Sequence, residues 1–97
     1  MVRLVLTFPP KLERIVAEAM ITAQQRPRFT VQRGYGHGFQ HRPTADELIH
    51  GRAERIVLWS LIPAQEIDAL LDFLRRHVRS KDVLWWVEPV LHVGDLA

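Results

Sequence analysis

The segment Arg33-Gly34-Tyr35-Gly36-His37-Gly38 holds the residue types in this chain that are best suited to binding chemistry. Glycines at alternate positions permit positive φ angles and let main-chain N–H groups come close to an anion. Gly34, Tyr35, Gly36, His37 and Gly38 are therefore candidate ligand-binding residues. The alternative is a flexible exit from a strand, because a dinucleotide fingerprint would need a helix directly after the run.

Histidines recur through the same polar stretch. His37 and His41 are four residues apart, His50 follows, and Asp46 and Glu47 add carboxylates. Imidazole is the commonest ligand of transition metals, so we predict a divalent metal site formed by His37, His41 and His50. Such a site weakens below about pH 6.5, where imidazole becomes protonated. The alternative is an ordinary solvated loop.

A second group of candidates lies towards the C-terminus. Arg79, Lys81 and His92, together with the Gly34–Gly38 backbone, suit a cleft for an anionic small molecule, and the alternative is surface charge at a turn. Trp85 and Trp86 fit a core or an interface better than a ligand contact. We do not expect an enzyme, because no nucleophile has an activating partner and no carboxylate pair stands in an apolar setting.

Composition limits the possible classes of protein. The 97 residues make one domain, 1–97, and carry a formal charge of +2. The basic residues are scattered rather than gathered in a stripe, which argues against a nucleic-acid partner. The chain has no cysteine, so disulfides and thiolate metal sites are excluded. No apolar run reaches the length of a membrane span and the start does not resemble a signal peptide, so we expect a cytoplasmic protein without membrane insertion.

The elements that must position these residues follow an alternating order. Val2 to Phe8 alternates like a strand, a helical pattern runs from Pro10 to about Gln25, and Arg28 to Arg33 is a short second strand. Arg55 to Ile62 is a third strand, apolar on both faces, and apolar residues repeat at helical spacing from Ile67 to Val78. Val83 to Val87 is a fourth strand, in which Trp85 and Trp86 must point to opposite faces. Val90, Leu91 and Val93 allow a short C-terminal strand.

This order predicts an α+β fold of the ferredoxin-like, split βαβ type, with a four-stranded antiparallel sheet and both helices on one face. Val5, Val57, Trp59, Leu61 and one of the paired tryptophans would leave the other face apolar and uncovered. We therefore expect a homo-oligomer in which sheets pack together. The alternative is that the C-terminal segment folds over that face.

At this point the residues resemble a family. The second strand ending in Gly34-Tyr35-Gly36, the loop of about residues 37–53, the passage through Pro63 and the closing Trp86-Val87-Glu88-Pro89-Val90 are similar to the PII signal-transduction proteins, in which this loop is the T-loop. Gly36-His37-Gly38, Gly51-Arg52 and Trp85-Trp86-Val87-Glu88-Pro89-Val90 more narrowly resemble an uncharacterised PII-like family whose genes lie beside heavy-metal efflux pumps.

The resemblance implies a homotrimer with ligand sites between subunits, at the T-loop base and the turn after the second helix. Nucleotide-binding PII proteins carry Gly-Asp-Gly-Lys in that turn, whereas this chain has Val78-Arg79-Ser80-Lys81, which argues against ATP or ADP binding. The loop also has no tyrosine to be uridylylated. The resemblance thus implies a regulatory protein that senses a ligand or metal and signals to a protein partner, a heavy-metal efflux system. The alternatives are a CutA-like divalent-metal-binding protein and a ferredoxin-like enzyme subunit.

Overall fold

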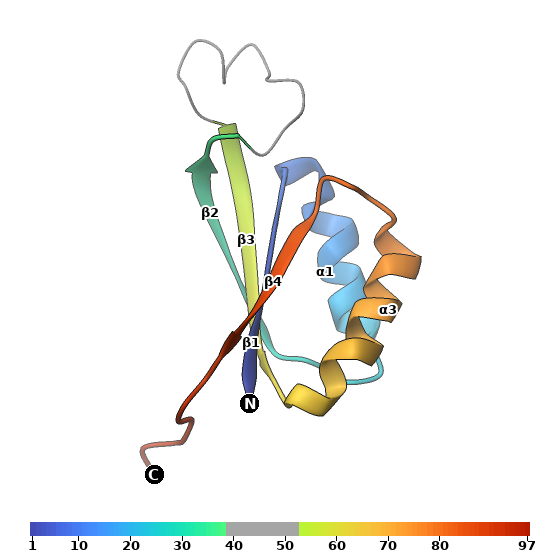
Figure 1. Cartoon of the computed structure of the whole chain (residues 1–97). Coiled ribbons are helices and arrows are strands. Elements are labelled where there is room, and N and C mark those ends of the chain that lie inside the picture. The colour runs from blue at the N-terminus through green and yellow to red at the C-terminus, as the bar shows by residue number, and fades with distance from the viewer. Residues whose placement is uncertain (39–52) are drawn as a thin grey trace.

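A computed structural model of the chain describes residues 1–38 and 53–97. Short 3-10 turns over Pro10–Leu12 and Ala64–Glu66 follow prolines and lead into the two α-helices. Strands and helices alternate along the chain (Figure 1): β1 Val2–Phe8, α1 Glu13–Thr22, β2 Phe29–Gly36, β3 Ala53–Ile62, α3 Ile67–Val78 and β4 Leu84–Pro89.

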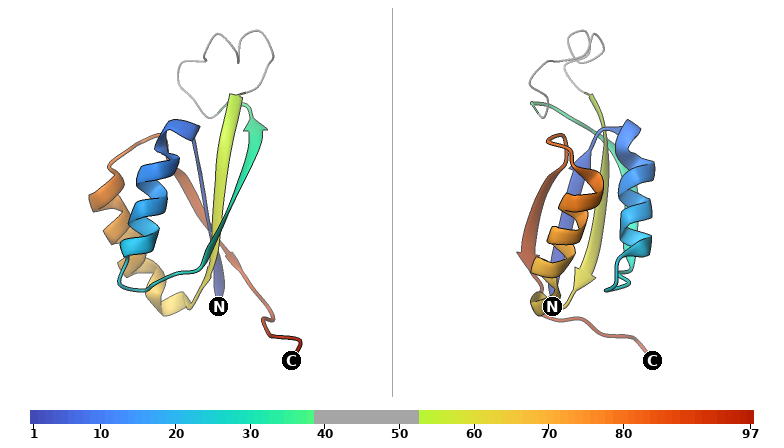
Figure 2. Two further views of the ribbon diagram at one scale, coloured as in Figure 1. Left: turned by 180° about the vertical axis from the view of Figure 1, so that it is seen from behind. Right: turned by 90° about the vertical axis from the view of Figure 1, so that its right-hand side faces the viewer.

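The strands form one antiparallel sheet in the order β2-β3-β1-β4. Each βαβ unit places its second strand two positions away, with another strand between, as a split βαβ arrangement requires. Both helices cover the same face of the sheet (Figure 2). Among the described helices, none is long and apolar enough to cross a lipid bilayer.

The core lies between this covered face and the helices. Alternate residues of the central strands point into it, as the two-residue period of a strand demands. The most buried of them, each at most 2% exposed, are Leu4, Leu6 and Phe8 on β1 and Ile56, Leu58 and Ile62 on β3. The helices contribute residues at helical spacing: Val16, Ala19 and Met20 on α1 and Ile67, Leu70, Leu71 and Leu74 on α3.

The predicted fold class is confirmed, and several element bounds are close. β1 and α3 begin and end where the periodicity indicated. α1 is shorter than predicted, ending at Thr22, before the chain turns through Arg26 with a positive φ of 48°. The C-terminal strand of the sheet is β4, and residues 90–97 form no further strand.

The face without helices is apolar at its centre. Trp59 and Trp86 lie opposite Val5 on either side, and Val5 between them is 2% exposed. Their neighbour Trp85 points to the helix side instead, so the two adjacent indoles do face opposite ways. The C-terminal segment does not fold over the centre of this helix-free face. Val93 lies near Trp59 and Leu61 at one end of it, whereas Leu91 and Leu96 are 88% and 109% exposed.

A polar strip crosses the helix-free face. The indole N–H of Trp86 donates to Glu88 Oε1 at 2.8 Å, and Arg3 Nη1 donates to Glu88 Oε2 at 3.2 Å. The Arg3 guanidinium lies 5.0 Å above the ring of Trp59. Arg3 and Glu88 are thus paired within the chain, which favours burial of this strip against another surface.

Candidate functional site

The turn between α3 and β4 brings cationic residues together. α3 ends at Val78, and Arg79 follows in the left-handed conformation with φ 49° and ψ 48°. A residue in this conformation commonly ends a helix, but glycine usually occupies the position, because a Cβ atom is strained there. Arg79 Nε donates to the carbonyl oxygen of Arg76 at 3.2 Å, which satisfies one of the last carbonyls of the helix.

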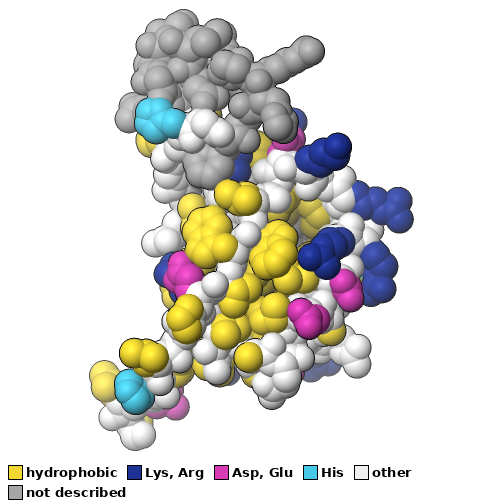
Figure 3. All heavy atoms as spheres, in the orientation of Figure 1, with side chains coloured by type: hydrophobic (Ala, Val, Ile, Leu, Met, Phe, Trp, Pro, Cys, Tyr) yellow, Lys and Arg dark blue, Asp and Glu magenta, His cyan; other side chains and the backbone are white. Residues whose placement is uncertain are grey.

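A cavity of about 360 Å³ opens beside this turn. It lies on the helix side of the sheet, between α3 and β4, where Figure 3 shows hydrophobic side chains over β4 flanked by Lys and Arg side chains. Arg79 and Lys81, both predicted as ligand-binding residues, line this cavity together. Trp85 and Arg75 line it too, with the Arg75 guanidinium 5.8 Å from the Trp85 ring centre.

Arg55 connects this turn to the start of β3. Its side chain lies on the helix-free face and is nevertheless buried, with 3% of the residue exposed. Nε donates to Thr7 Oγ1 at 3.4 Å, and Nη2 donates to the carbonyl oxygen of Asp82 at 3.5 Å. The guanidinium thereby spans from β3 across β1 to the residues before β4.

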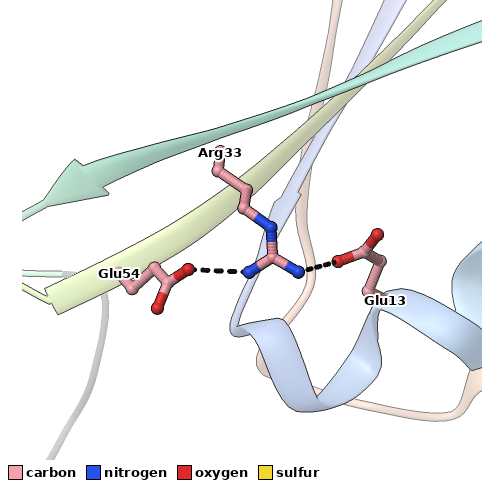
Figure 4. A network of polar contacts seen from close by, with 3 residues as sticks. All are labelled: Glu13, Arg33 and Glu54. Atoms are coloured by element: carbon pink, nitrogen blue, oxygen red, sulfur yellow. Dashed lines mark hydrogen bonds and ion pairs between the residues drawn. The ribbon is translucent and has the colours of Figure 1, made fainter.

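A second arginine holds the ends of β2 and β3 against α1 (Figure 4). Arg33 Nη1 donates to Glu54 Oε1 at 2.7 Å, and Nη2 donates to Glu13 Oε1 at 3.0 Å. The hydrogen bond with Glu54 and the charge of Glu13 raise the pKa of Arg33 above the ordinary value of arginine. Arg33 therefore stays protonated at any pH at which the fold survives, and this clamp of Glu13, Arg33 and Glu54 is independent of the arginine's titration.

The glycine run is mostly strand rather than loop. β2 continues through Gly36, where Gly34 pairs with Arg55 and Gly36 pairs with Ala53. Only Gly38 among the described glycines has a positive φ, 73°. Pairing with β3 holds the backbone of Gly34 and Gly36 extended, so of the three glycines only Gly38 adopts the positive φ that their residue type permits. Tyr35 is exposed in the same strand.

The predicted ligand residues do not converge within one chain. β2, with Gly34 to Gly36, and β4, next to the Arg79–Lys81 turn, are the two edge strands of the sheet. His92 follows the far end of β4, beyond Pro89, which pairs with Val2 at the start of β1. His92 is therefore at the opposite end of the sheet from Lys81. A site that uses both edges would have to take residues from two chains.

The metal hypothesis falls mainly outside the described residues. His37 lies just past β2 and is exposed, whereas His41 and His50, with Asp46 and Glu47, belong to residues 39–52. Within residues 1–38 and 53–97, no group of three His, Asp or Glu side chains is placed to hold a metal ion.

Two arginines that connect these elements, Arg55 and Arg33, were missed by sequence reasoning. Arg55 was considered only as the start of a strand, although it falls on the same face as Val57, Trp59 and Leu61. A charge in register with apolar residues was the available signal. For the Arg33 clamp there was no local signal, since its partners lie 20 and 21 residues away.

Comparison with known proteins agrees with this architecture. The sequence model of the family DUF3240, described as "Protein of unknown function", matches residues 1–97. The crystal structure of a DUF3240 family protein from Shewanella baltica superposes with a TM-score of 0.78 at 19% identity, over 99% of this chain and 96% of that one. At this identity the likeness concerns the fold alone. No curated protein matches the sequence significantly.

Proposed function

The chain belongs to the DUF3240 family, and we infer that it acts as a PII-like regulatory protein. It binds a small ligand next to the base of the loop between β2 and β3, and it signals through that loop to a protein partner. It works as a homotrimer. The partner implied by the PII-like resemblance is a heavy-metal efflux system.

One observation carries this proposal. Arg55, two residues after the loop re-enters the sheet, donates to the backbone of Asp82 in the turn that lines the cavity. A ligand that shifts this turn changes the position of the acceptor for Arg55, and so acts on the strand that leads out of the loop. This supports coupling between a binding site and a signalling element.

The apolar centre of the helix-free face supports self-association. Trp59, Val5 and Trp86 form a continuous row across three strands, and Leu61 and Leu84 remain 38% and 49% exposed beside it. Such a face is more apolar than a monomer usually leaves in water. A site combining Gly34–Gly38 with Lys81 would also require assembly, because the two segments belong to opposite edge strands of one sheet.

The first test is a calorimetric and thermal-shift screen of the purified protein, with its mass measured by light scattering. A ligand that binds the native state raises the free energy of unfolding by about 2.7 kcal/mol at a hundredfold excess over Kd. We expect small organic anions to bind, and we expect a mass three times the 11.3 kDa of one chain. A monomer, or no response to any ligand, contradicts the proposal.

The same screen distinguishes the CutA-like alternative, a divalent-metal-binding protein, from a sensor of organic ligands. Zinc, copper and nickel ions are included, with a variant in which His37, His41 and His50 are all alanine. Stoichiometric metal uptake that this variant loses, without any binding of organic anions, favours a divalent-metal-binding protein over a ligand sensor.

A further inference from the structure

The cavity at the α3–β4 turn has the size of a small-molecule site. Its volume of about 360 Å³ lies near the lower end of the range of about 300–1,000 Å³ found for ligand pockets. A cavity of this size suits a small organic molecule better than a macromolecular segment.

The floor of the cavity is apolar. Leu71 and Leu74 of α3, Leu6 of β1 and Val83 before β4 line it from three sides. Trp85 closes the remaining side from the edge strand and is still 41% exposed. The Arg75 guanidinium lies 5.8 Å from the centre of this ring. The part of the indole that remains exposed is apolar, and covering it with an apolar group is favourable.

The rim is cationic. Arg75, Arg79 and Lys81 all line the cavity, and none of its lining residues is acidic. The C-terminal end of α3 presents a partial negative charge of about half an electron, which three cations exceed. Arg75 Nη1 forms an ion pair with Asp72 Oδ1 at 3.0 Å, whereas Lys81 makes no ion pair with any residue the structure describes. A neutral molecule would leave this positive rim unused.

The Arg79 guanidinium has donor groups available for an anionic group. Its Nε is fixed on the Arg76 carbonyl, and in the described part of the chain its two terminal nitrogens have no hydrogen-bond acceptor. Two parallel N–H groups of this kind match the two oxygens of a carboxylate or phosphate. The strained backbone of Arg79 supports a functional reading, because glycine would end the helix there without strain.

We propose that this cavity binds a small amphipathic organic anion, with its carboxylate or phosphate group at Arg79 and Lys81 and its apolar body against Trp85 and Leu74. This rests on the ligand-sensing function proposed above and adds the chemical class of the ligand. His92 and the glycine run take no part in it.

The test uses four probes on the full chain by titration calorimetry: octyl phosphate and octanoate, octanol as the neutral body, and inorganic phosphate as the bare head group. We expect the first two to bind, and octanol and inorganic phosphate to bind at least about tenfold more weakly. A preference between octyl phosphate and octanoate identifies the head group. Equal binding of octanol contradicts recognition of an anion.

Three variants locate the site. Lys81→Gln and Arg79→Gly should each weaken octyl phosphate binding about tenfold, the effect of one charge-assisted hydrogen bond. Arg14→Gln removes the same charge from an exposed position on α1 and should change nothing. Amide chemical-shift changes should centre on Val83, Trp85 and α3. Changes centred on Trp59 and Trp86, or equal losses in all three variants, overturn the assignment.

The outcomes for the cavity and for the sensing function are distinguishable. If octyl phosphate binds here but alters neither the residues that flank the loop nor the oligomeric mass, the cavity assignment stands and the sensing function fails. If the probes do not bind while another ligand in the screen does, the assignment fails and sensing stands.

Discussion

Arg55 is a charged side chain buried on a face of the sheet that no helix covers. A buried guanidinium is tolerated when hydrogen bonds replace its lost hydration. Here Thr7 and the Asp82 carbonyl accept two of those bonds, which ties β3 to β1 and to the turn before β4. Arg55 therefore matters for stability, and under the proposed function it also couples the turn to the loop.

We expect Arg55→Met, which keeps most of the side-chain volume, to lower the free energy of unfolding by about 1–2 kcal/mol, because two hydrogen bonds are lost from a buried position. Urea denaturation measures this change. The free energy of unfolding of Arg55→Lys should lie between those of Arg55→Met and the wild type, since a lysine cannot make both hydrogen bonds in the same geometry. Arg14→Met serves as an exposed control, and an effect equal to that of Arg55→Met would contradict a special role for Arg55.

Replacing Arg79, unlike replacing Arg55, is expected to increase the stability of the fold. Replacing it with glycine removes the clash of its Cβ in the left-handed region, and this outweighs the greater backbone freedom of glycine in the unfolded chain. Arg79→Gly should raise the free energy of unfolding by about 0.5–1 kcal/mol while weakening binding of octyl phosphate. Arg76→Gly, within the right-handed helix, should destabilise instead. A less stable Arg79→Gly protein would show that the arginine is retained for the fold.

At the scale of elements, predictability followed the strength of the repeating pattern. α3 could be predicted closely because its apolar residues recur at helical spacing between Pro63 and the turn. The residue pattern alone ended β2 at Arg33, because glycines at 34 and 36 signal a loop locally, whereas the PII resemblance extended the strand to Gly36, where it ends. Pairing of Gly36 with Ala53 in β3 overrides that preference. The cavity combines α3 with β1 and β4, and no single segment of sequence indicates it.

The clamp on β2 predicts a local effect. Exposed ion pairs add little to global stability, so Arg33→Gln should leave the urea midpoint almost unchanged. Amide exchange at Gly34, Tyr35 and Gly36 should become several-fold faster, because the ion pair between the end of β2 and Glu13 of α1 is lost. Arg14→Gln should leave those amides unchanged. Since the pKa of Arg33 is raised, the difference between wild type and variant should be the same at pH 7 and pH 9.

At the scale of the whole molecule, the two faces of the sheet differ. One is covered by α1 and α3, and the other carries the row of Trp59, Val5 and Trp86 and the strip through Glu88 and Arg3. The strip can be buried against a copy of this face without leaving Arg3 or Glu88 unpaired, because the two already form an ion pair. The apolar pattern of alternate strand residues made this face visible in the sequence, whereas the pairing of Arg3 with Glu88 depends on the register of β1 with β4.

A charge placed on this face tests assembly without disturbing the chain itself. Leu84 is 49% exposed in the single chain, so Leu84→Glu costs little there. In an assembly the same carboxylate would be buried without a partner, at an expense of several kcal/mol. We expect light scattering to show that Leu84→Glu shifts the protein towards the 11.3 kDa of one chain.

Ile21→Glu is the matched control, because Ile21 is 68% exposed on α1, away from the sheet face. This variant should keep the wild-type mass. If Leu84→Glu also keeps it, the helix-free face does not hold the subunits together. If Ile21→Glu alone dissociates the protein, assembly occurs through the helices. The sheet faces of two chains are then not in contact. Dissociation of Leu84→Glu alone identifies the sheet face as the contact between subunits, and such a contact is needed before the Gly34–Gly38 edge of one chain can meet the Lys81 turn of another.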